Sequence, residues 1–130
     1  MINQNELSRV LEADPSLQIV ILFGSMANGQ IRTDSDIDIA VAANKPLDAG
    51  AKLALIDSIG ERIGRPVDLV DLRNAGEPLL GQILRKGKKL LVRDRRLLEA
   101  LISRHLVDTE DFLPYRHLIL EQRRREWIGK

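Results

Sequence analysis

The chain has 130 residues, of which 44% are hydrophobic, 30% charged and only 3% aromatic. This balance is typical of one soluble domain with an aliphatic core. The absence of cysteine excludes disulfides and thiolate metal sites and favours a reducing, cytoplasmic location. No apolar run approaches the roughly 20 residues that a membrane-spanning helix needs. Basic residues gather in the second half of the chain, a pattern that solvated helices explain without direct nucleic-acid binding.

The first part of the chain predicts one helix and two strands. Apolar residues at helical spacing indicate a helix over 5–13, which ends before Pro15 because the residue before proline avoids helical geometry. The short, β-branched apolar run 17–23 favours a buried strand. A polar, glycine-containing stretch follows, and the alternating residues 36–42 predict the next strand.

The middle of the chain continues this alternation of helices and strands. Apolar residues spaced by four predict a helix over 47–63, which Gly64 ends. A strand over 66–72, a helix over 77–86 and an edge strand over 88–92 are expected next. The lysines of that last strand are a common protection against pairing with another chain.

Residues from 94 onward have a helical pattern, with a break at 109–111 and a final helix over about 112–128. We expect an α/β (α+β) fold with a short mixed sheet flanked by helices. Residues 1–93 would form the main domain. Residues 94–130 would form a helical extension of the same compact unit, with a surface on which a partner docks.

Three aspartates on the predicted strands require a chemical explanation. Asp36 and Asp38 are two residues apart on one strand, so their side chains leave the same face about 7 Å apart. A hard divalent cation would remove the repulsion between such carboxylates, and oxygen ligands without cysteine favour Mg²⁺ or Mn²⁺. Asp68 lies in the strand 66–72, which a neighbouring strand could bring beside the pair.

The first strand ends at Gly24-Ser25, a pair suited to phosphate. Glycine lets a phosphate approach the backbone, and the N-terminus of a following helix would offer free N–H groups. The hydroxyl of Ser25 can bind the same phosphate. Together with the three acids, this pair indicates phosphoryl or nucleotidyl transfer assisted by two metal ions.

The spacing Gly24-Ser25, ten residues, Asp36-Ile37-Asp38 matches the GS-x10-D-x-D signature of the nucleotidyltransferase superfamily that includes DNA polymerase beta. The string FGSMANGQIRTDSDIDIAV resembles its smallest branch, the minimal nucleotidyltransferases (MNT), over about residues 17–92. This resemblance implies that Asp36, Asp38 and Asp68 bind two Mg²⁺ ions. It also implies that Gly24 and Ser25 contact the triphosphate of ATP, and that Asp68 is the third acid and the base.

Proteins of this size in the MNT family resemble antitoxins that act on a HEPN-domain ribonuclease toxin. The stretch PVDLVDLRNAGEPLLGQILRKGKKLL looks particularly like them. The resemblance implies transfer of AMP from ATP to a tyrosine of the toxin, which would bind this chain as a hetero-oligomer. Two alternatives stay open: an antitoxin that acts by binding alone, and a transferase acting on a small molecule or an RNA end.

Other residues have plainer interpretations. Asp36 could cap a turn, and Asp68 could be a surface acid on an edge strand. Asp71 is out of phase with Asp68 and is expected to cap the next turn. His105 and His117 lack a metal-ligand spacing and are expected to be structural or surface residues. The remaining candidates each have a structural and a functional interpretation: Arg32, Tyr115, Arg123 to Arg125, Trp127 and Ile128.

Overall fold

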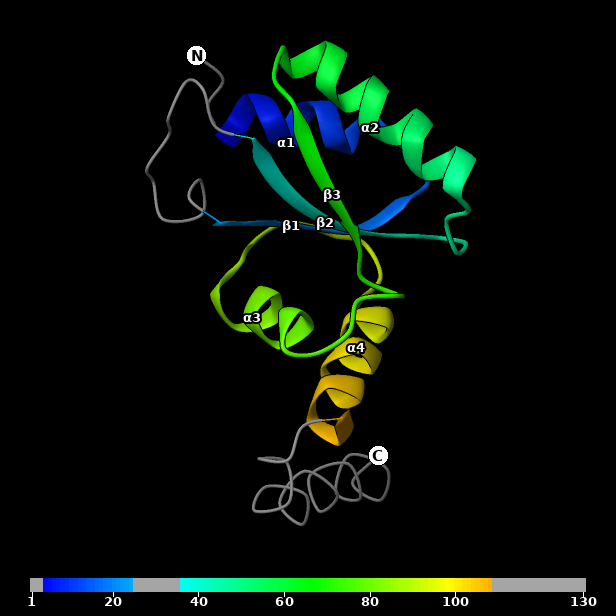
Figure 1. The fold of residues 1–130 in the computed structure, drawn as a ribbon, viewed down its shortest axis with the longest axis vertical. Coiled ribbons are helices and arrows are strands. Elements are labelled where there is room, and N and C mark those ends of the chain that lie inside the picture. Colours follow the sequence, from blue (N-terminus) through cyan, green and yellow to red (C-terminus); the bar gives the residue numbers. More distant parts are fainter. Residues whose placement is uncertain (1–3, 25–35, 109–130) are drawn as a thin grey trace.

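The computed structural model describes residues 4–24 and 36–108. Helices and strands follow one another in this part of the chain in the order that the hydrophobic pattern predicts (Figure 1). The elements are α1 (Gln4–Glu12), β1 (Leu17–Phe23), β2 (Ile37–Ala43), α2 (Ala49–Ile63), β3 (Val67–Asp71), α3 (Leu79–Lys86), β4 (Lys88–Val92) and α4 (Arg95–Asp108). The expected break at 109–111 and helix over 112–128 lie outside the described residues.

The four described strands form one mixed sheet in the order β3-β2-β1-β4. The strands β2 and β3 are parallel, whereas β1 pairs antiparallel with both β2 and β4. Helices α1 and α2 cover one face of the sheet, and α3 and α4 cover the other (Figure 1). This three-layer arrangement confirms the expected α/β fold with a short mixed sheet flanked by helices.

Side chains that alternate along the strands build a separate core on each face of the sheet. In β2, Ile37, Ile39 and Val41 face the α1/α2 side, whereas Ala40 and Ala42 face the α3/α4 side. Fully buried leucines from the helices complete each layer: Leu7 and Leu11 against the first face, and Leu80 against the second.

Helix α2 shows how local sequence sets the ends of an element. Its N-cap is Asp48, whose carboxylate accepts a hydrogen bond of 2.7 Å from the backbone N–H of Ala51. This cap starts the helix at Ala49, two residues later than the apolar spacing predicts. The helix ends at Gly64, whose φ of 68° is left-handed and therefore favours glycine.

Strand β4 is an edge of the sheet, as predicted, and Lys88 and Lys89 are exposed on it. The register between β1 and β4 shifts after Val20, which pairs with Leu91, whereas Ile21 pairs with Lys89. This bulge lets Leu90 and Leu91 both pack against the α1/α2 core. It also determines the face on which each lysine lies.

Helix α4 extends away from the sheet (Figure 1), and its Leu101 is buried in the α3/α4 core. The predicted division of the chain at residues 93 and 94 stays a prediction. None of the described helices is long and apolar enough to cross a membrane.

Candidate active site

Asp38 of β2 and Asp68 of β3 lie side by side in the sheet. The parallel register pairs them directly, and the antiparallel register pairs Asp38 with Phe23 at the end of β1. Paired residues on neighbouring strands direct their side chains to the same face. Phe23 packs against the α3/α4 core, so both acids lie on that face of the sheet, at the end where β1 finishes.

Like charges and partial burial act together on Asp38. Burial raises the pKa of the Asp38 carboxyl above its ordinary value of 3.8, and the charge of Asp68 raises it further. A side-chain hydrogen bond with Asp68 and the charge of Asp36 act in the same direction. Partial burial and the neighbouring acids therefore act in the same direction, and both favour the neutral form of the Asp38 carboxyl.

Gly24 directly follows β1 and lies against the Asp38 carboxylate. Its φ of 72° is left-handed, a conformation that L side chains adopt only with strain. A Cβ built on Gly24 would overlap Oδ2 of Asp38. Glycine is therefore required at residue 24 for two independent reasons, its left-handed backbone conformation and its contact with Asp38.

The structure brings together four of the five residues that the sequence singles out. Asp36 is exposed and directly precedes β2, close enough for its charge to act on Asp38. Asp68 is exposed on an edge strand, which agrees with its interpretation as a surface acid. It nevertheless faces Asp38. Ser25 lies outside the described residues, as does Arg32.

The donor set of this site suits a hard cation. Carboxylate oxygens on one face are the ligands that Mg²⁺ prefers, and a bound cation favours their ionised form. Within residues 4–24 and 36–108, no three acidic or histidine side chains converge closely enough to form a ready metal site. Metal binding by Asp36, Asp38 and Asp68 therefore stays a prediction.

Residues 5–96 match the protein-family model described as polymerase beta, nucleotidyltransferase. The chain belongs to this nucleotidyltransferase family. A curated relative, the protein adenylyltransferase MntA of Shewanella oneidensis, is 40% identical over 90 residues. That alignment covers 68% of this chain and 65% of the relative, so the chain spans about two thirds of the relative's length.

Two solved structures are similar to this member of the nucleotidyltransferase family over nearly its whole length. A chain of a toxin–antitoxin complex with AMP-PNP has 34% identity and a TM-score of 0.69, and the match covers 98% of this chain and 95% of that one. A chain of the tri-AMPylated Shewanella oneidensis HEPN toxin in complex with its MNT antitoxin has 32% identity and a TM-score of 0.62. That match covers 96% of this chain and 91% of the other. These likenesses confirm the expected minimal branch.

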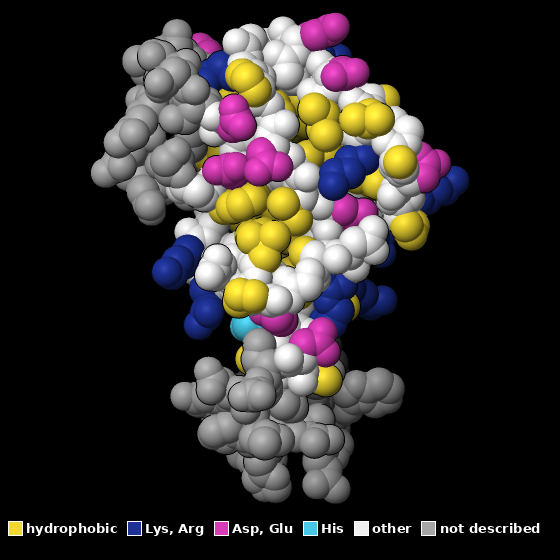
Figure 2. Space-filling view, viewed as in Figure 1, with side chains coloured by type: hydrophobic (Ala, Val, Ile, Leu, Met, Phe, Trp, Pro, Cys, Tyr) yellow, Lys and Arg dark blue, Asp and Glu magenta, His cyan; other side chains and the backbone are white. Residues whose placement is uncertain are grey.

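The face of this nucleotidyltransferase family member that Figure 2 shows is divided by side-chain type. In Figure 2, Asp and Glu side chains gather at the level of the sheet, and hydrophobic side chains lie directly below them. Lys and Arg side chains flank this area beside α3 and α4.

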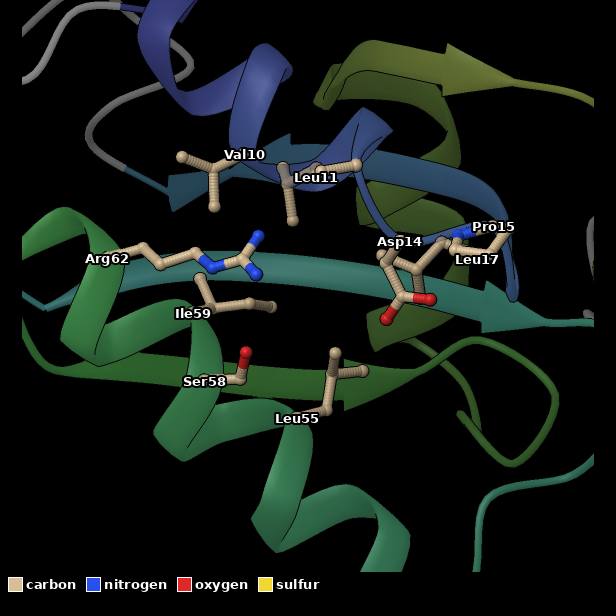
Figure 3. Close-up of a pocket in the computed structure, with 10 residues that line it drawn as sticks. Val10, Leu11, Asp14, Pro15, Leu17, Leu55, Ser58, Ile59 and Arg62 are labelled. Atoms are coloured by element: carbon tan, nitrogen blue, oxygen red, sulfur yellow. The ribbon is translucent and has the colours of Figure 1, made fainter.

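A hollow of about 210 Å³ lies between α1 and α2, on the other face of the sheet (Figure 3). Aliphatic side chains such as Leu55 and Ile59 line it together with the polar groups of Ser58, Arg62 and Asp14. Because the acids face the α3/α4 side, this hollow takes no part in the candidate active site.

Sequence reasoning missed the arginine that holds the loop after β3. The guanidinium of Arg104 in α4 donates to the carbonyls of Leu72, Arg73 and Ala75, at 2.5 to 2.8 Å. A basic residue on a helix carries no pattern that reveals such a role. Only its position opposite three backbone carbonyls reveals it.

Two expectations for polar residues are confirmed. The buried carboxylate of Asp71 accepts hydrogen bonds from the backbone N–H of Arg73 and the side chain of Asn74, as expected for a turn cap. His105 is structural, because its Nδ1 lies 2.6 Å from Oε1 of Glu77 in a largely buried pair that links α4 to the start of α3. His117 lies outside the described residues.

Proposed function

We propose that this protein is an antitoxin that transfers AMP from ATP to a tyrosine of a HEPN-domain ribonuclease toxin. The observation that carries the proposal is the placement of Asp38 and Asp68 on one face, with Gly24 against Asp38. The relative with 40% identity is named a protein adenylyltransferase. Similar solved chains come from toxin–antitoxin complexes, one with AMP-PNP and one with a tri-AMPylated HEPN toxin.

Each site residue has a role in this proposal. Asp36, Asp38 and Asp68 hold two Mg²⁺ ions, which when bound neutralise the charge that develops on the triphosphate. Gly24 and Ser25 hold the phosphates of ATP, because glycine admits a phosphate to the backbone. Most of the rate then comes from positioning of the reactants and neutralisation of charge.

The exposed carboxylate of Asp68 is accessible to an acceptor that comes from another protein. We assign it the role of the base that takes the proton of the tyrosine hydroxyl. The phenolic oxygen then bonds to the α-phosphorus, and the bond from that phosphorus to the bridging oxygen breaks. Pyrophosphate leaves with the electron pair, so the reaction produces AMP-tyrosine and pyrophosphate.

The partner and the location follow from the same proposal. A protein acceptor agrees with the toxin–antitoxin complexes to which the similar solved chains belong, and we assign the docking surface to the C-terminal extension that begins at residue 94. We place the protein in the cytoplasm. A sequence without cysteine is compatible with that reducing compartment, and the proposed ribonuclease target would act there. Direct binding of nucleic acid is not part of this function.

The test is a transfer assay with α-labelled ATP, Mg²⁺ and the purified toxin. We expect label on the toxin with the wild type and none with Asp36→Asn/Asp38→Asn. The matched control, Asp57→Asn/Glu61→Gln, removes two exposed acids from α2 and should transfer normally. If the acid-pair variant still protects against the toxin without transfer, the antitoxin acts by binding alone. Label on RNA or a small molecule instead of the toxin would contradict the proposed acceptor.

A further inference from the structure

Lys88 and Lys89 are the only basic residues in the four described strands. They are neighbours on edge strand β4, beside the end of β1 that precedes Gly24. Because successive residues of a strand face opposite sides, the two lysines differ in position although they share charge, strand and exposure. They therefore offer a matched pair for testing what charge does at this edge.

The register decides which lysine faces the acids. Lys89 pairs with Ile21, which belongs to the α3/α4 core, whereas Lys88 pairs with Leu22, which belongs to the α1/α2 core. Paired residues share a face, so Lys89 lies on the face that carries Asp38. Lys88 lies on the opposite face. The β-bulge after Val20 produces this assignment.

The separation between Lys89 and the acids can be bridged by a lysine side chain together with a bound triphosphate. Two strand spacings and two residue steps separate Lys89 from Asp38, which places their Cα atoms about 12 Å apart. The end of β1, with Gly24, lies between them. An extended lysine side chain on one side and a chain of three phosphates on the other can bridge this distance.

We infer that Lys89 binds the terminal phosphates of the bound nucleoside triphosphate and then the departing pyrophosphate. This inference rests on the proposed function, which places the α-phosphate at the acids and Gly24. A cation at the far end of the triphosphate stabilises the negative charge of the terminal phosphates, which the carboxylates of the acids cannot stabilise. A role restricted to edge protection would involve Lys88 and Lys89 equally, so the comparison of the two lysines separates these roles.

The test measures nucleotide affinity directly, by calorimetric titration of ATP and of AMP in the presence of Mg²⁺. We expect Lys89→Gln to weaken ATP binding about tenfold, as for the loss of one charge-assisted contact, and to leave AMP binding unchanged. Lys89→Arg should restore ATP affinity, and Lys88→Gln should match the wild type. Size-exclusion chromatography checks that each variant keeps its oligomeric state. Unchanged ATP affinity in Lys89→Gln, or an equal loss in Lys88→Gln, overturns the inference.

Transfer to the toxin, measured in parallel, separates this inference from the proposed function. If the wild type transfers AMP and Lys89→Gln binds ATP normally, the lysine inference is wrong and the proposed function stands. If Lys89→Gln loses ATP affinity selectively but the wild type never transfers AMP, the phosphate contact stands and the proposed function is wrong.

Discussion

Gly24 and Asp38 lie so close together that no side chain fits at residue 24 without displacing the Asp38 carboxylate. Gly24→Ala should therefore move this acid and strain the left-handed backbone at the same time. We expect a loss of transfer rate on the order of a hundredfold, because small misplacements in a preorganised site have effects of that size. The rate of AMP transfer measures it.

Gly76→Ala is the matched control for this glycine, because nothing lies within 4 Å of a Cβ at that position. We expect its transfer rate to equal that of the wild type and its stability to change by less than about 0.5 kcal/mol. Normal transfer by Gly24→Ala would contradict the close contact described here.

The raised pKa of Asp38 predicts a specific dependence of stability on pH. The folded protein holds the proton on this carboxyl more tightly than the unfolded chain, whose pKa is near 3.8. The carboxyl therefore stabilises the folded state at low pH, and this contribution is lost as the pH rises through the raised pKa. Without Mg²⁺, Asp38→Asn should be more stable than the wild type at neutral pH. Thermal unfolding at a series of pH values measures the difference.

Mg²⁺ should reverse this order, since a bound cation removes the repulsion that Asp38→Asn relieves. The melting temperature of the wild type should rise with Mg²⁺ at neutral pH, and that of Asp38→Asn should respond less. An equal response of both proteins to Mg²⁺ would argue against Asp38 as a ligand.

Asp68 and Asp71 belong to the same strand, β3, but we expect their substitutions to have different effects. One should reduce the transfer rate and the other the free energy of unfolding. Asp68→Asn changes an exposed acid and should abolish transfer with little effect on the free energy of unfolding. Asp71→Asn weakens a buried cap that accepts two hydrogen bonds and should cost about 1 to 3 kcal/mol. Urea unfolding and the transfer rate, measured on both variants, test this. The prediction fails if Asp68→Asn retains normal transfer.

Arg104→Met should destabilise the protein by about 2 to 3 kcal/mol, because it leaves three backbone carbonyls without their charged donor. Hydrogen exchange should increase in residues 72–77 before it increases in β1. Arg96→Met is the control, since it removes an exposed arginine from the same helix. Equal stability losses in the two variants would show that helix charge, and not the carbonyl contacts, is responsible.

Sequence reasoning predicted every described helix and strand because the apolar pattern follows the two periods, 3.6 and 2, over most of the chain. The ends of α2 and α3 are also predictable, because a glycine directly follows each helix: Gly64 after α2 and Gly87 after α3. The position of Asp38 beside Gly24 was harder to predict. It depends on which strands pair and in what register, and that pairing is a long-range property.

The edge position of β3 shows where the sequence alone is insufficient. A short strand such as Val67–Asp71 carries no local sequence signal that says whether one or two strands flank it. The bulge in β4, which determines the faces of Lys88 and Lys89, has no glycine or proline to mark it. The contacts of Arg104 and the pair of His105 with Glu77 depend in turn on how α4 crosses α3, which local pattern does not encode.

Among the described strands, β3 has a partner on one side only, so its single ladder of hydrogen bonds with β2 decides which way Asp68 faces. One residue inserted between Gly64 and Val67 could shift that ladder by one position and turn Asp68 toward α2, with Gly24, Asp36 and Asp38 all retained. Relatives that have lost transfer could thus keep the complete glycine–serine and aspartate signature. An inventory of signature residues would count such proteins as enzymes, whereas the length of the α2–β3 connection would identify them.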